Sequence, residues 1–194
     1  MNISTLPAAL LALALVSFAP AQAEDTQRWS GTSTIGFAGT STLHDWSGKV
    51  SAEPFTATVT LDDKGQPAAL KATVQVKAAG MDTAEPKRDD NMHSAMRVTD
   101  YPLISAAMNS PFTQVMGGST PARLPFSLSL VGKKEDVVGT ISNWKLKGDT
   151  ATFDLDFEVS MKKYGITVPS VLLVIRVGDT VKIHAEVKLT RKSA

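Results

Sequence analysis

The sequence contains no cysteine among its 194 residues. A disulfide framework, a thiolate metal site and a cysteine nucleophile are therefore excluded. An excess of charge of one sign is also lacking, because 20 Lys and Arg stand against 19 Asp and Glu. That balance argues against nucleic acid as a partner. With 43% hydrophobic residues the chain is too apolar to be disordered, and its length allows one domain or two small ones.

The N-terminal segment has no charged side chain before residue 24. Residues 3–18 form a short apolar run, and Ala21 and Ala23 follow it in an A-x-A pattern. This combination predicts a secretory signal peptide over residues 1–23, cleaved after Ala23. The run is too short for a helix of about 20 spanning residues, so no stable membrane span is expected; an uncleaved anchor is the alternative. Residues 24–194 would then form one domain in the periplasm, or outside the cell.

The rest of the chain alternates apolar and polar residues. The alternation is strict over residues 151–162, and it returns over residues 55–61, 70–78, 126–130 and 181–189. Period two is typical of β-strands with one apolar face, whereas a helix would scatter these residues around its surface. Turn-forming residues, mainly glycine and aspartate, separate the runs. Long antiparallel strands of this kind tend to close into a barrel, because closure removes edges and buries the apolar face.

One short helix is expected near residues 87–98. The segment has no β-branched residue before Val98, Pro86 suits a first helical turn, and Arg97 lies late, where a cation matches the helix dipole. Met92 and Met96 are four residues apart and share one face. One hypothesis is that this helix covers one mouth of the barrel. The interpretation that we favour is that the two methionines simply fill the core beneath it.

Three motifs point to a known family. The first is GTSTLHDWSG at residues 39–48, and the second runs through residues 81–104, from MDT to the helix and then YPLI. The third occupies residues 163–179, with KYGI, VP and VGD. Together, and in this order, they resemble the YceI family of periplasmic lipid-binding proteins. The likeness is greatest to the branch with the Ser-Thr-Leu-His-Asp-Trp signature.

The resemblance implies an all-β fold, an extended lipocalin-like barrel of eight antiparallel strands. An apolar tunnel in this barrel would hold a long isoprenoid chain, such as a polyprenyl phosphate or a quinone tail, and no other cofactor is expected. A headgroup would meet His44 and Arg88 at a mouth, although a salt bridge from Arg88 to Asp89 or Asp90 is the alternative. The expected lining residues are large apolar side chains: Phe37, Trp46, Phe55, Met92, Met96, Leu103, Phe126, Phe153 and Phe157.

No catalytic or metal site is expected. His44 and Asp45 are adjacent, and adjacent strand residues point to opposite faces, so a structural turn is favoured over a catalytic pair. The three histidines lack metal-ligand spacing, and no G-x-S-x-G or phosphate-binding loop is present.

An acidic row follows one face of the 151–162 strand. It consists of Asp154, Asp156 and Glu158. We expect it to face water and to pair with lysines of a neighbouring strand, with His184 solvated on a similar face.

The sequence thus favours a non-enzymatic carrier of an amphiphilic lipid. A structural or interaction module whose barrel is filled by its own side chains is the alternative, and a hydrolase is a minor one. Barrel closure disfavours pairing through sheet edges, so a monomer or a helix-mediated homodimer is expected.

Overall fold

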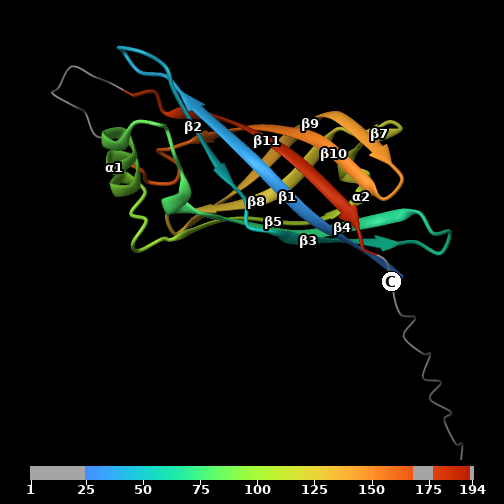
Figure 1. Cartoon of the computed structure of the whole chain (residues 1–194). Helices are drawn as coiled ribbons and strands as arrows, with labels where there is room; N and C mark the ends of the chain where they lie inside the picture. Colours follow the sequence, from blue (N-terminus) through green and yellow to red (C-terminus); the bar gives the residue numbers. More distant parts are fainter. Residues whose placement is uncertain (1–24, 168–176, 193–194) are drawn as a thin grey trace, which may run out of the picture.

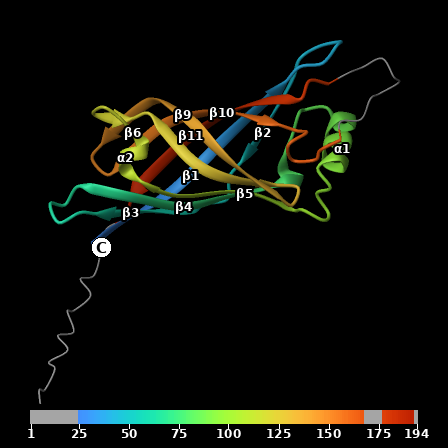
Figure 2. The same cartoon turned by 180° about the vertical axis from the view of Figure 1, so that it is seen from behind.

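A computed structural model describes residues 25–167 and 177–192. The predicted signal peptide lies outside the described residues. The described part is an elongated barrel of long, tilted strands, with one helix at each end (Figures 1 and 2).

Eight strands form the barrel, and each is antiparallel to both of its neighbours. Pairing of the last strand with the first closes it. The prediction of an all-β, closed, eight-stranded antiparallel barrel is therefore confirmed. In barrel order the strands are β1 (Thr26–Gly39), β3 (Phe55–Leu61), β4 (Pro67–Lys77), β5 (Leu103–Pro111), β8 (Arg123–Leu130), β9 (Lys133–Lys147), β10 (Thr150–Ser160) and β11 (Thr180–Arg191).

Shorter elements complete the fold. Strand β2 (Trp46–Ser51) pairs with the second half of β1, while β3 pairs with the first half. The others are the 3-10 turn η1 (Ala78–Gly80), helices α1 (Pro86–Ala95) and α2 (Phe112–Val115), and the small hairpin of β6 (Met116–Gly117) and β7 (Thr120–Pro121).

The two ends of the barrel are built from different connections. The helix end contains the β1–β2 turn at residues 40–45 and the segment 78–102 with η1 and α1. The hairpin end contains the β3–β4 turn, the segment 112–122 with α2, and the β9–β10 turn at residues 148–149. Strand β1 starts at the hairpin end and β11 finishes there, as the antiparallel register requires.

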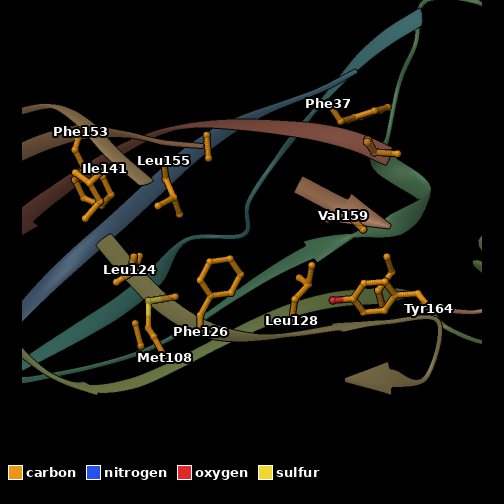
Figure 3. Close-up of a cluster of buried hydrophobic side chains, with 14 of the residues drawn as sticks. Phe37, Met108, Leu124, Phe126, Leu128, Ile141, Phe153, Leu155, Val159 and Tyr164 are labelled. Carbon is orange, nitrogen blue, oxygen red and sulfur yellow. The ribbon is translucent and has the colours of Figure 1, made fainter. Parts of the chain in front are cut away.

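The alternation seen in the sequence becomes the inside and outside of the barrel wall. In β10, Phe153 and Leu155 are each 8% exposed, whereas Asp156 and Glu158 are exposed on the outside. Figure 3 shows side chains of facing strands pointing into the same interior. Burying one apolar face on every strand supplies the main stabilisation of a fold that has no disulfide.

Three glycines accommodate aromatic rings on the inner wall. In each pair the glycine lies directly opposite the aromatic residue in the strand register, and a Cβ on the glycine would come within 2.3 Å of a ring atom. The ring therefore occupies the space that a side chain on the facing strand would fill. The pairs are Gly31 with Phe55, Gly48 with Phe37, and Gly39 with Trp46.

Helix α1 begins at Pro86, one residue before the predicted range, and ends at Ala95, three residues before the predicted end. The Glu85 side chain caps its start by accepting a hydrogen bond from the Lys87 backbone N–H at 3.2 Å. The early end follows from Arg97, whose φ of 50° is left-handed and cannot continue a right-handed helix. Within the described residues, neither helix has the length and apolar character needed to cross a bilayer.

Candidate functional site

The barrel interior encloses a cavity of about 930 Å³. All eight barrel strands contribute to its lining, as do β2, α1 and α2. The cavity extends from Met92 at the helix end to Phe112 and Leu146 at the hairpin end. Its volume is near the upper end of the range for small-molecule sites, about 300–1,000 Å³. The described part of the barrel is therefore not filled by its own side chains.

Eight of the nine predicted lining residues do line this cavity. Those eight are Phe37, Trp46, Phe55, Met92, Met96, Phe126, Phe153 and Phe157.

The prediction is wrong for Leu103, which is 44% exposed and lies outside the lining. The reason is the strand period: its neighbour Ile104 lines the cavity, so Leu103 must point outward. Leu103 was predicted because it belongs to the YPLI motif. Alternation along β5 instead predicts that Ile104, Ala106 and Met108 line the cavity, as they do.

Several lining residues were not among those predicted, although the alternating runs contain many of them, such as Leu70, Val74 and Ile183. Trp29, Ser33 and Ile35 on β1 lie outside those runs, yet they follow the same period as Phe37. The side chains of α2, by contrast, lack a strand pattern, and their place in the lining follows from where the chain turns after β5.

Helix α1 lies across one end of the barrel, as Figures 1 and 2 show. Met92 in the helix and Met96 at its C-cap both line the cavity, and Met96 is only 7% exposed within the hydrophobic core. The two interpretations of this helix are therefore compatible, since it covers a mouth and also fills the space beneath itself. Unbranched, polarizable methionine side chains can repack around a flexible ligand at such a position.

Polar contacts hold α1 over the mouth. The Asp89 carboxylate accepts hydrogen bonds from the Thr83 hydroxyl at 2.7 Å and from the Thr83 backbone N–H at 2.9 Å. The hydroxyl bond is the largest reason why the pKa of Asp89 lies below its ordinary value, with desolvation opposing it. The ring of His93 adds a contact of 3.0 Å between Nε2 and the carbonyl oxygen of Met81.

The loop that receives these contacts is itself tied to the barrel wall. The Lys49 N–H donates to the Asp82 carbonyl at 2.8 Å, and the Asp82 N–H donates to the Lys49 carbonyl at 3.0 Å. The helix, its preceding loop and β2 thus form one connected cover.

The two predicted headgroup residues both border the cavity at the helix end. Arg88 is half-buried, and among the described residues no ion pair joins it to Asp89 or Asp90. His44 is exposed in a turn in which the Ser41 hydroxyl donates to the His44 carbonyl at 2.6 Å. No hydrogen bond joins the His44 and Asp45 side chains in the part of the chain that the structure describes, which agrees with a structural turn.

Three buried polar atoms interrupt the apolar lining. They are Trp29 Nε1, Ser33 Oγ and Trp46 Nε1, and none has a hydrogen-bond partner within the described residues. Ser33 is 8% exposed and lies midway along β1, between Trp29 near the hairpin end and Trp46 at the helix end. A guest with an oxygen atom could satisfy such a group, whose unpaired burial is otherwise costly.

The acidic row on the outer wall makes different contacts from those expected. Asp156 accepts from His184 Nδ1 at 2.7 Å, and Asp154 accepts from Asn143 Nδ2 at 2.6 Å, rather than from lysines of β11. The hydrogen bond to Asp156 is the main reason why the pKa of His184 is raised. His184 is therefore paired, and not merely solvated as predicted.

Candidate metal ligands do not gather around the cavity. Over residues 25–167 and 177–192, no group of three or more His, Asp or Glu side chains could hold a metal ion. The cavity offers shape, apolar surface and a few hydrogen-bonding atoms, which suits binding.

A family model described as the YceI-like domain matches residues 29–189 of the sequence. That match spans all of the barrel strands except the ends of β1 and β11. No curated protein matches the chain.

Solved structures with the same architecture include three distant relatives. BcnA of Burkholderia cenocepacia is 17% identical, with a TM-score of 0.63, over 80% of this chain and 95% of that one. A polyisoprenoid-binding domain from Saccharophagus degradans, implicated in plant cell wall breakdown, is 10% identical, with a TM-score of 0.61, over 84% and 98%. A YceI protein of Campylobacter jejuni is 16% identical, with a TM-score of 0.51, over 72% and 82%. At these identities the likeness concerns the fold.

Proposed function

The chain belongs to the YceI-like domain family, and from that premise we propose that it is a non-enzymatic carrier of a long-chain amphiphilic lipid. The observation that carries the proposal is the apolar cavity between the two barrel ends. The ligand class we propose is an isoprenoid, such as a polyprenyl phosphate or a prenylquinone. It is supported by the relative described as a polyisoprenoid-binding domain.

The energetics favour a long hydrocarbon chain. Each CH₂ moved from water into an apolar site contributes about 0.8 kcal/mol, so about ten of them give a gross gain of about 8 kcal/mol. Part of that gain offsets the loss of freedom of the bound chain. Aromatic side chains such as Phe126 and Phe153 line the middle of the cavity, where no charge would have to be desolvated.

The headgroup is proposed to lie at the helix end. Arg88 offers a cation at the cavity rim, and His44 and Asn91 offer further polar side chains there. An Arg guanidinium can bind a phosphate with two parallel hydrogen bonds. The tail would then extend past Ser33 toward the hairpin end.

The same proposal includes export. A signal peptide over residues 1–23, removed after Ala23, would deliver the barrel to the periplasm as a monomer or a homodimer. A fold without cysteine needs no oxidation step in that compartment.

The test is native mass spectrometry of the purified protein, followed by solvent extraction of the bound material. We expect a lipid mass that is lost on denaturation. Ala106→Trp, which places a large side chain in the cavity, should abolish the bound mass, whereas Ala107→Trp on the outer face of the same strand should retain it. Thermal unfolding of both variants checks that they fold. Wild-type protein that is consistently free of lipid would instead support an envelope interaction module.

A further inference from the structure

Leu146 is an exposed apolar side chain at the hairpin end of the barrel. It is 59% exposed, yet it also borders the cavity, so it lies on the rim of this mouth. It is the next-to-last residue of β9, two positions before the tight turn at residues 148–149. An apolar side chain in this position is exposed to water unless a partner or another apolar phase covers it.

A cluster of cations surrounds this rim. Lys145 and Lys147 flank Leu146, and they point outward because Trp144 and Leu146 border the cavity. Thr152 pairs with Lys145 on one side and with Lys188 on the other, so these side chains form one row across three strands. We call the cluster the basic rim; its members are Lys145, Lys147, Lys188, Arg191 and Lys192.

The charge of the basic rim is little compensated. Asp149 forms an ion pair with Arg191, with a hydrogen bond of 2.7 Å from Nε. Among the described residues, no ion pair involves the four lysines of the rim. All four are exposed, so their charges face the solvent.

Two tryptophans border the cavity at the same end. The Arg191 guanidinium lies 5.9 Å from the ring centroid of Trp29, and the Trp144 ring lies 5.7 Å from that of Phe153. Tryptophan, with an apolar body and a polar N–H, is favoured where an apolar phase meets water. Trp144, which is only partly buried, fits such a position, whereas the N–H of Trp29 is buried.

The loop and helix that cover the helix end lack this charge pattern. Leu43 is also 59% exposed beside the cavity there, but Asp45 lies close to it in the chain. The segment 82–100 carries five acidic side chains against three cations. The acidic residues are Asp82, Glu85, Asp89, Asp90 and Asp100, and the cations are Lys87, Arg88 and Arg97.

We propose that the hairpin end docks on a lipid bilayer that contains anionic lipid. Leu146 enters the boundary between headgroups and acyl chains, while the basic rim lies over the anionic headgroups. The mouth of the cavity then opens on the membrane. The inference rests on the proposed function in one respect: the docked mouth would bring the tail end of the bound lipid, which faces this end of the barrel, against the acyl chains of the membrane.

The test is flotation of the purified protein with vesicles of phosphatidylcholine, alone or mixed with phosphatidylglycerol. We expect binding to the mixed vesicles, and we expect high salt to weaken it, because salt screens the attraction. Lys145→Gln with Lys147→Gln should lower the partition coefficient about tenfold, since each cation near an anionic surface contributes severalfold. Leu146→Gln should lower it severalfold, without the salt dependence being lost.

Matched control variants remove cationic or apolar side chains at other positions on the surface. Lys162→Gln with Lys163→Gln takes two cations from the helix end, and Val138→Gln removes an apolar side chain that is 61% exposed on the wall. Both should bind within about twofold of wild type. Equal losses in the controls, or equal wild-type binding to both kinds of vesicle, would overturn the proposal. So would tighter binding to a DNA duplex that is insensitive to Leu146→Gln.

The lipid content of the same preparations separates this inference from the proposed function. Barrels that retain lipid but do not float with vesicles refute docking and leave the carrier proposal standing. Barrels that float but hold no lipid support docking and refute the carrier.

Discussion

The two ends of the barrel use their polar residues in opposite ways. At the helix end, Asp89 is bonded to Thr83, and His93 contacts the backbone of Met81, so polar groups hold a cover in place. At the hairpin end, a tight turn joins β9 to β10, and the nearby lysines Lys145 and Lys147 remain free of ion pairs within the described residues. One end is stabilised by contacts between distant segments, and the other leaves its charges available to a partner.

The cavity is therefore covered at one end of the barrel, and the charged side chains that a partner could contact lie at the other end. A helix of ten residues is marginal alone in water, so α1 depends on tertiary contacts for its position. A two-residue hairpin turn is stabilised by the ladder of the strands that it joins. Disturbing the cover should therefore affect stability more than disturbing the hairpin turn.

The largest difference in stability is expected when two glycines, one near each end, are replaced by alanine. At Gly48, near the helix end, an added Cβ would lie 2.3 Å from Phe37 Cζ and 2.7 Å from the Asp82 carbonyl oxygen. At Gly148, in the β9–β10 turn, nothing lies within 4 Å, and the cost is the left-handed φ of 55°.

Gly48→Ala should therefore lower the free energy of unfolding by about 2–3 kcal/mol, through overpacking against an immovable carbonyl. Gly148→Ala should lower it by about 1 kcal/mol. Urea denaturation measures both. A greater loss at Gly148 would contradict the view that the helix end is the more tightly constrained of the two.

A smaller effect is expected from Asp89→Asn, and it should depend on pH. Because hydrogen bonds from Thr83 lower the pKa of Asp89 in the folded protein, the ionised carboxylate stabilises the fold. This contribution is present above the unfolded-state pKa of about 3.9 and is lost as pH falls through the lower folded value.

The melting temperature of Asp89→Asn should thus lie below that of wild type at neutral pH, and the gap should close in acid. Thermal melts between neutral pH and about pH 3 test this. Asp90→Asn on the same helix is the matched control, and a gap of the same size for both variants would count against the Thr83 contact.

The smallest effect is expected on the outer wall between the two ends, at His184 and Asp156. The bond to Asp156 raises the pKa of His184, so the pair stabilises the fold below the unfolded pKa of about 6.5. The benefit is lost as pH rises through the folded value.

Both side chains of this pair are about half exposed, so solvent screening limits the contribution to about 0.5 kcal/mol. His184→Gln should flatten the dependence of unfolding free energy on pH between about 6 and 8. A flat wild-type profile over the same range would show that the pair contributes nothing.

The wall of the barrel could be predicted because strand alternation is local. Phe153 and Leu155 are apolar at every second position, and whichever strand pairs with β10, they must share a face. Leu103 shows the limit of motif reasoning, because a residue in a shared motif was preferred over its inward neighbour Ile104.

The ends of the barrel were less predictable. The predicted helix extended past the observed end of α1. The helix ends early because Arg97 has a positive φ, and no sequence rule predicts a positive φ at a non-glycine residue such as this one. The pairing of Asp156 with His184 depended on which strands became neighbours and in what register. The basic rim likewise joins residues 145–147 to residues 188–192, more than 40 positions apart.

By itself, the sequence determined a closed antiparallel barrel with an apolar inside, one helix and no disulfide, because period, turns and composition are properties of the chain alone. Only the tertiary structure decided that the inside is open, with a cavity of about 930 Å³. An internal volume is what remains after facing side chains have packed, and here glycines such as Gly31 let rings lie over the wall. The same strand register decided which charges gather at each mouth, which no local pattern contains.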